Sequence, residues 1–297
     1  MKYNNVIVGV MIMTALALAD TEKTSNLFFA GIRSSIYGFD GKFPSPEEAA
    51  NVILNVSQKL QSAPSAVWLV GTIQDNGFCR LEFPAKGKNI SSLKYDRHEK
   101  YLSKFDEIGA KIFLQIEAGN ADMKTLVDLV MKQYGHHKCV VGFGIDVEWY
   151  PSDGTTNCSD DGRKTPLDKP QLQELDKHLK TFGKNYRLFV KHWEPQYLGN
   201  SPVSDVIYIS DSQDLENLNN MVDEFALWAE KFAPNDVGFQ FGYNSDKSWW
   251  ETMDDPILEI TNALKDRIKN QKVHIYWVDF SIRDDRFDNL WKIPQAK

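Results

Sequence analysis

The stretch VVGFGIDVE, residues 140–148, decides how this chain folds. It is apolar or glycine until two carboxylates follow at its end. Such a nearly continuous apolar run is typical of a parallel strand covered by helices. Because strand side chains alternate between two faces, Asp146 and Glu148 share a face with Gly142 and Gly144. The stretch predicts a buried parallel strand with two acids on one face at its C-terminal end.

Seven further segments of this kind occur, and most are followed by a helix-like segment. They are Leu27–Ile32, Ala66–Val70, Lys111–Ile116, Tyr186–Val190, Val206–Ser210, Val237–Phe241 and Val273–Phe280. Helix punctuation is clear at residues 45–48, where Ser-Pro-Glu-Glu combines an N-cap, a first-turn proline and a capping-box glutamate. Eight strands alternating with helices predict a single-domain α/β fold, a (β/α)8 TIM barrel. An open doubly wound sheet is the alternative, but no glycine-rich phosphate loop follows the first strand.

Two connections are short for such a barrel. Residues 193–205, after the fifth strand, contain proline and glycine and leave little room for a helix. The tail after the eighth strand, residues 281–297, is also short for a closing helix. We therefore expect a shortened connection after the fifth strand and a short C-terminal tail.

Residues 1–19 have the features of a secretory signal peptide. Lys2 gives a positive start, residues 6–18 are almost wholly apolar, and Ala-Leu-Ala at 17–19 suits a signal peptidase. The apolar run is shorter than the about 20 residues that cross a membrane, although an N-terminal anchor is the alternative. We expect secretion, no stable membrane insertion after cleavage, and a barrel domain over residues 20–297.

The three cysteines fit an exported chain. Cys139 begins an apolar run, whereas Cys79 and Cys158 lie in polar segments, so we expect a Cys79–Cys158 disulfide. Glycosylation would be expected in a host that modifies secreted proteins. The N-x-S sequons begin at Asn55, Asn89 and Asn157.

Composition excludes some functions. The 297 residues carry 34 Lys+Arg against 41 Asp+Glu, a formal net charge of −7, with no long basic run, which argues against nucleic-acid binding. HExxH, paired CxxC, GxSxG and Walker motifs are absent from the sequence. The adjacent His136 and His137 have no spaced partner. We therefore expect no metal and no cofactor; a metal phosphodiesterase built on Glu117, Asp146 and Glu148 is a remote alternative.

The paired acids point to a chemistry. In such barrels the active site lies at the C-terminal ends of the strands. Close carboxylates repel each other, which raises one pKa and leaves a proton available near neutral pH. A general acid acting on a glycosidic oxygen needs such a proton, so we expect the Asp146 and Glu148 pair to supply general acid/base catalysis. The alternative is that both acids merely pair with Arg33, Lys191 or a loop amide.

The stretch Gly142–Glu148 resembles the fourth-strand motif DGxDxDxE of the family-18 glycoside hydrolases, the chitinase-like barrels. The resemblance implies that Glu148 is the proton donor and that Asp146 orients the N-acetyl group of the substrate. Residues 111–119 are similar to that family's third-strand stretch KxxLSxGG. Trp277 lies where the family has a tryptophan beneath the sugar.

The sequence also departs from that family. Val141 and Gly144 replace the first two aspartates of the motif. This loss motivates a second hypothesis, a catalytically inactive carbohydrate-binding barrel. A D-x-E pair on this strand also resembles the family-25 lysozyme-type hydrolases of cell-wall glycan, although residues 29–33 lack their first-strand aspartate.

Other strand ends carry polar and aromatic side chains that suit a sugar cleft. Glu117 is the best second carboxylate partner for Glu148, because the third and fourth strands are neighbours. The candidate carbohydrate-binding residues are Trp277, Tyr208, Asp211, Gln240, Glu117, Gln115, Tyr243 and Arg33. The sequence thus predicts a secreted hydrolase of a polysaccharide or amino-sugar glycan.

Overall fold

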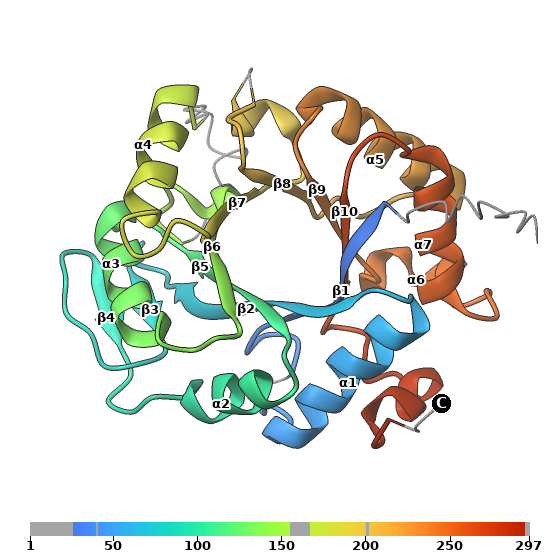
Figure 1. Ribbon diagram of the computed structural model, residues 1–297, viewed down its shortest axis with the longest axis horizontal. Helices are drawn as coiled ribbons and strands as arrows, with labels where there is room; N and C mark the ends of the chain where they lie inside the picture. Colours follow the sequence, from blue (N-terminus) through green and yellow to red (C-terminus); the bar gives the residue numbers. More distant parts are fainter. Residues whose placement is uncertain (1–25, 40, 155–166, 200–201, 295–297) are drawn as a thin grey trace, which may run out of the picture.

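The computed structural model describes residues 26–39, 41–154, 167–199 and 202–294. Within them, parallel strands form a closed barrel (Figure 1). The barrel strands are β1 (Leu27–Ser34), β2 (Ala63–Ile73), β5 (Lys111–Glu117), β6 (Val140–Asp146), β7 (Arg187–Lys191), β8 (Ile207–Ser210), β9 (Val237–Phe241) and β10 (Val273–Val278). They pair in the order β1-β10-β9-β8-β7-β6-β5-β2, and β1 pairs with β2 to close the ring. The predicted (β/α)8 barrel is confirmed.

Helices surround the strands. They are α1 (Pro46–Lys59), α2 (Glu99–Glu107), α3 (Met123–Tyr134), α4 (Lys169–Leu179), α5 (Leu218–Phe232), α6 (Lys247–Trp250) and α7 (Pro256–Arg267). Helix α1 begins as its sequence predicts, because the Ser45 side chain accepts from the Glu48 N–H and the Glu48 carboxylate accepts from the Ser45 N–H. Among the described residues, none of these helices is long and apolar enough to cross a bilayer.

Short 3-10 turns take the place of helices in the connection after β7 and in the C-terminal tail, the two segments expected to be short. In its described part, the β7–β8 connection has only η2 (Pro195–Leu198). The tail after β10 forms η4 (Asp285–Trp291), which packs on α1 (Figure 1). Asn55 ties the two together by donating to the Leu290 and Lys292 carbonyls, both at 2.8 Å.

A small extension of β2 was missed by the sequence patterns. Strand β3 (Cys79–Leu81) pairs antiparallel with the end of β2, and β4 (Ile90–Ser92) pairs with β3. Three-residue strands are too short to give a periodic signal. The extension corrects the expected Cys79–Cys158 disulfide: Cys79 is a free, fully buried thiol on β3 rather than part of a polar loop. Cys158, Asn157 and residues 1–19 lie outside the described residues.

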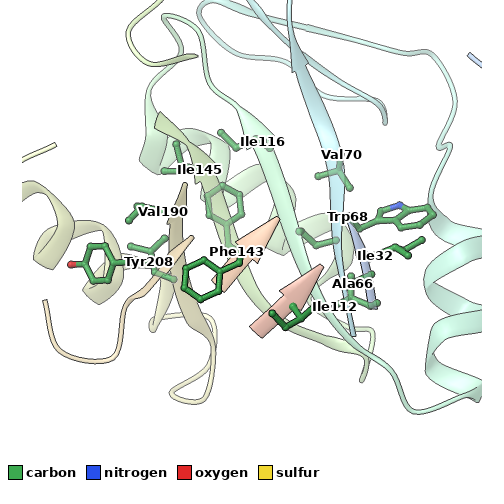
Figure 2. Packing of buried hydrophobic residues seen from close by; sticks show 14 of the residues in the cluster. Ile32, Ala66, Trp68, Val70, Ile112, Ile116, Phe143, Ile145, Val190 and Tyr208 are labelled. Carbon is green, nitrogen blue, oxygen red and sulfur yellow. The ribbon is translucent and has the colours of Figure 1, made fainter. Parts of the chain in front are cut away.

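Two apolar layers flank the strands. The larger lies between strands and helices and includes Phe143, Ile145 and Tyr208 (Figure 2). The smaller fills the barrel and includes Phe113 and Phe189. Side chains of β6 alternate between the two layers. Phe143 and Ile145 face the helices, whereas Gly142 faces the Phe113 ring and Gly144 the Phe189 ring inside the barrel.

The glycines of β6 make the barrel filling possible. A Cβ on Gly144 would lie 2.0 Å from the Phe189 ring, and one on Gly142 would lie 2.5 Å from the Phe113 ring. The space beneath the two acids is therefore occupied by phenylalanine, and the acids sit on a packed apolar floor.

Candidate active site

A pocket of about 640 Å³ opens at the C-terminal ends of the barrel strands. Parallel strands in a barrel bring the residues that end each strand to the same rim. The residues lining the pocket include Arg33, Tyr37, Gln74, Asp75, Glu117, Asp146, Glu148, Trp149, Lys191, Asp211, Gln213, Tyr243 and Phe280. The pocket thus combines several carboxylates, two cations and four aromatic rings.

A buried lysine holds two of the carboxylates. The Nζ of Lys191, at the end of β7, lies 2.8 Å from Asp146 Oδ2 and also contacts Asp211 Oδ2. Gln115 Nε2 donates to Asp146 Oδ2 at 3.4 Å. The second oxygens of Asp146 and Asp211 are buried without a hydrogen-bond partner among the described residues.

Glu148 lies beside this pair. It follows Asp146 in the 3-10 turn η1 (Val147–Trp149) that ends β6, and it is half-buried. Carboxylate oxygens of Asp146, Glu148 and Asp211 lie within 4.8 Å of one another. The sequence predicted the proximity of Asp146 and Glu148, and the fold adds Asp211 from the end of β8.

This crowding keeps protons on the acids. Burial, and then the charges of Asp146 and Asp211, raise the pKa of Glu148 to about 8. Burial also raises the pKa of Asp146, to about 7, although the ammonium group of Lys191 acts to lower it. The pocket therefore holds a protonated carboxylic acid at neutral pH. The alternative that the acids pair with a cation describes Asp146 and Lys191 correctly.

Glu117 ends the neighbouring strand β5, where it is in register with Asp146. Its Oε2 accepts from the Ile73 N–H at 3.0 Å and from the Tyr37 hydroxyl at 3.1 Å. Burial raises the pKa of Glu117, while these donors and the nearby charge of Arg33 lower it. Arg33 is itself held by Asp279, at 3.3 Å. Glu117 and Arg33 are thus fixed in place at the pocket.

Two predicted sugar-binding residues lie elsewhere, and the structure corrects both. Trp277 is fully buried, donates to Ser281 Oγ at 2.8 Å and packs edge-on against Trp250. The Tyr208 hydroxyl accepts from the Val203 N–H at 2.8 Å, and its ring stacks on a helix residue, away from the barrel (Figure 2). Strand alternation is the reason, since it turns both side chains toward the helices.

Two predicted glutamines lie within the barrel. Gln240 and Gln115 are fully buried and are not among the residues that line the pocket. Gln115 still reaches the site through Asp146. Both polar atoms of the Gln240 side chain lack a hydrogen-bond partner within the described structure. Of the candidate carbohydrate-binding residues, Arg33, Glu117, Asp211 and Tyr243 do line the pocket.

The candidate list missed several residues that line the pocket, among them Tyr37, Gln213 and Phe280. Tyr37 lies in the turn after β1 and Gln213 follows β8. Phe280 is the last residue of the predicted eighth strand but lies two residues past the end of β10. Residues that follow the strand ends therefore belong in such a candidate list.

The chain is similar to known proteins in its fold and not in its sequence. No family model matches, and no curated protein matches, so the family-18 resemblance remains one of short motifs. Similar solved structures include Bacteroides uniformis beta-glucuronidase 2 covalently bound to cyclophellitol-6-carboxylate aziridine, with 12% identity, a TM-score of 0.51 and coverage of 85% of this chain and 30% of that chain.

A second similar structure is TsXylA, an intracellular xylanase from Thermoanaerobacterium saccharolyticum. It has 10% identity and a TM-score of 0.45, with coverage of 84% of this chain and 85% of that chain. The chain spans between 30% and 43% of the length of the similar beta-glucuronidase structures. At these identities the likeness is one of fold alone, and the barrel itself is established by the strand pairing of this chain.

Proposed function

We propose that the protein is a glycoside hydrolase in which Glu148 is the general acid/base. The observation that supports this proposal most is the half-buried Glu148 carboxyl, whose pKa is raised to about 8 in a pocket with other acids. A proton held at neutral pH is what cleavage of a glycosidic bond requires, because the leaving oxygen must be protonated as the bond breaks.

The remaining carboxylates suit stabilisation of the positive charge that forms on the sugar. Positive charge develops on the sugar ring as the bond breaks, and negative side chains fixed nearby stabilise it. Asp146 and Asp211 are fixed by Lys191, so they are preorganised for this role. Asp146 also acts on Glu148, because its charge raises the pKa of that acid.

The rest of the pocket suits a sugar. Tyr37, Trp149 and Phe280 offer aromatic surface for the apolar faces of sugar rings. Arg33, Glu117 and Tyr243 offer hydrogen-bonding groups for hydroxyl or amide groups. A polysaccharide or an amino-sugar glycan is the substrate class that we propose, and residues 1–19 motivate the further proposal that the protein is secreted.

A second candidate function is a carbohydrate-binding barrel without turnover. The replacement of two motif aspartates by Val141 and Gly144 favours it. A lysozyme-type hydrolase of cell-wall glycan is a variant of the enzymatic proposal and differs from it only in substrate. The fold likeness to a beta-glucuronidase is compatible with all three.

Purified wild-type protein and two variants distinguish these functions. Chitin oligosaccharides, peptidoglycan and a panel of other glycans are incubated with each protein, and products and bound ligand are measured. Glu148→Gln removes the acid, whereas Glu107→Gln makes the same chemical change on α2, away from the pocket. We expect hydrolysis by the wild type and Glu107→Gln, and none by Glu148→Gln. Binding without turnover by all three proteins would refute the enzymatic proposal.

A further inference from the structure

A second cluster of titratable groups lies at the opposite end of β6 from Glu148. The turn that leads from α3 into β6 contains His136 and His137, for which the sequence offers no third metal ligand at a recognisable spacing. The fold brings them to Glu99, the first residue of α2. His137 Nε2 lies 3.3 Å from Glu99 Oε2, and His136 Nε2 lies 3.7 Å from Glu99 Oε1.

Asp106 fixes the orientation of His137. Its Oδ2 lies 2.8 Å from His137 Nδ1, and its Oδ1 accepts from the Cys139 N–H at 2.6 Å. Asp106 and Glu99 are seven residues apart, so they lie on the same face of α2, two turns apart. When Nδ1–H donates to Asp106, the Nε2 lone pair of neutral His137 is directed toward Glu99.

We propose that Glu99, His136 and His137 form a binding site for a divalent transition metal of the zinc type. Two imidazole nitrogens and one carboxylate are ligands that Zn²⁺ accepts, and it takes a water as its fourth. Zn–N and Zn–O bonds of about 2.1 Å place neighbouring tetrahedral ligands roughly 3.4 Å apart. One ligand atom from each residue lies within 4.8 Å of the other two. His137 Nε2 is 3.3 Å from Glu99 Oε2 and His136 Nε2 is 3.7 Å from Glu99 Oε1, so the carboxylate lies near the required separation from both imidazoles.

The surroundings of the cluster fit a metal in two further ways. Asp106 behind His137 supplies the carboxylate that metal-binding histidines use to set their tautomer and orientation. The His137 side chain is only 4% exposed, whereas those of His136 and Glu99 are 60% and 46% exposed. One ligand is therefore rigidly placed, and the other two can close on an ion that arrives from solvent.

The competing arrangement needs no metal. His137 as an imidazolium would donate one N–H to Asp106 and the other to Glu99, and His136 would lie beside Glu99 without a ligand role. The two arrangements differ in one respect, because only a metal site depends on both His136 and Glu99. The proposed role is structural: the ion would join α2 to the start of β6, independently of the proposed activity.

Metal titration of the full chain tests this inference. Protein stripped with a chelator is titrated with ZnCl₂ in a calorimeter, and with CoCl₂ while the visible absorption of tetrahedral cobalt is recorded. The variants are His136→Ala and Glu99→Gln, at side chains that are 60% and 46% exposed. The matched control is His178→Ala, since His178 pairs with Asp128 at 2.8 Å without a second histidine.

We expect the wild type and His178→Ala to bind Zn²⁺ equally, at one equivalent for this site. Both His136→Ala and Glu99→Gln should weaken that binding at least tenfold, and Zn²⁺ should raise the melting temperature of the wild type but not of His136→Ala. An absence of Zn²⁺ binding by the wild type would overturn the proposal. So would an affinity within tenfold of the wild type in either ligand variant.

Discussion

Replacement of Lys191 by methionine should destabilise the protein in a pH-dependent way. Lys191 is 2% exposed and lies 2.8 Å from an Asp146 oxygen. At an effective dielectric constant of about 20, two unit charges at that separation attract by roughly 6 kcal/mol. Because breaking a buried pair strands the remaining charge, we expect a loss of about 3–5 kcal/mol in the free energy of unfolding at pH 9.

The sign of the pH dependence follows from the pKa of Asp146. Burial raises this pKa to about 7, while Lys191 lowers it. Above pH 7 the wild-type Asp146 ionises and gains the attraction of Lys191. Without the lysine the pKa rises further, so the folded variant keeps a proton that the unfolded chain has released, and its stability goes on falling. The difference between the two proteins should therefore grow above pH 7, by up to about 1.4 kcal/mol per pH unit.

Guanidinium unfolding followed by tryptophan fluorescence measures the effect at pH 6 and pH 9. The control is Lys104→Met, which removes the lysine of a surface pair with Glu107. We expect Lys191→Met to lose about 1–3 kcal/mol more at pH 9 than at pH 6, and the control to behave alike at both. A loss from Lys191→Met that is equal at both pH values, or larger at pH 6, would refute the reasoning.

Three further predictions concern the barrel and the pocket. Gly144→Ala should cost about 1–3 kcal/mol and lower the melting temperature, because the new Cβ would lie 2.0 Å from the Phe189 ring; adding Phe189→Leu should restore part of the loss, and a fully stable single variant contradicts this packing. Trp277→Phe should lower the melting temperature and leave KM unchanged, since Trp277 faces the helices; a raised KM would return Trp277 to the sugar site. In a pH–rate profile, kcat/KM should fall as the pH rises through about 8, where Glu148 loses its proton; activity that continues to rise to pH 10 contradicts the assignment.

The barrel was predictable from the sequence because the apolar strands and the order of strands and helices both indicate it. Apolar runs such as residues 140–147 indicated buried strands, and their alternation with helices indicated the closed architecture. The order of Asp146 and Glu148 in the sequence also predicted that their carboxylates lie close together, although β6 ends at Asp146 and Glu148 lies in the turn η1.

Residues brought in by other elements were harder to predict. Trp277 was expected beneath the sugar from the family resemblance, and Tyr208 from its place near a strand end. Neither argument fixes which face of the strand carries the side chain, and both side chains face the helix layer. Tyr37 and Glu99 carry no local signal of their partners. Glu117 and Tyr37 are 80 residues apart in sequence, and only the closed barrel brings them together.

The central claim, that Glu148 donates the proton to the leaving group, is tested most directly by varying that leaving group. The wild type and Glu148→Gln are compared on the glycan that the wild type hydrolyses and on its 2,4-dinitrophenyl glycoside, whose leaving group departs without a proton. We expect Glu148→Gln to lower kcat/KM on the glycan by about 10²–10⁴ and to lower it far less on the activated glycoside. Equal losses on both substrates, or no loss on either, would contradict the assignment of Glu148 as the acid.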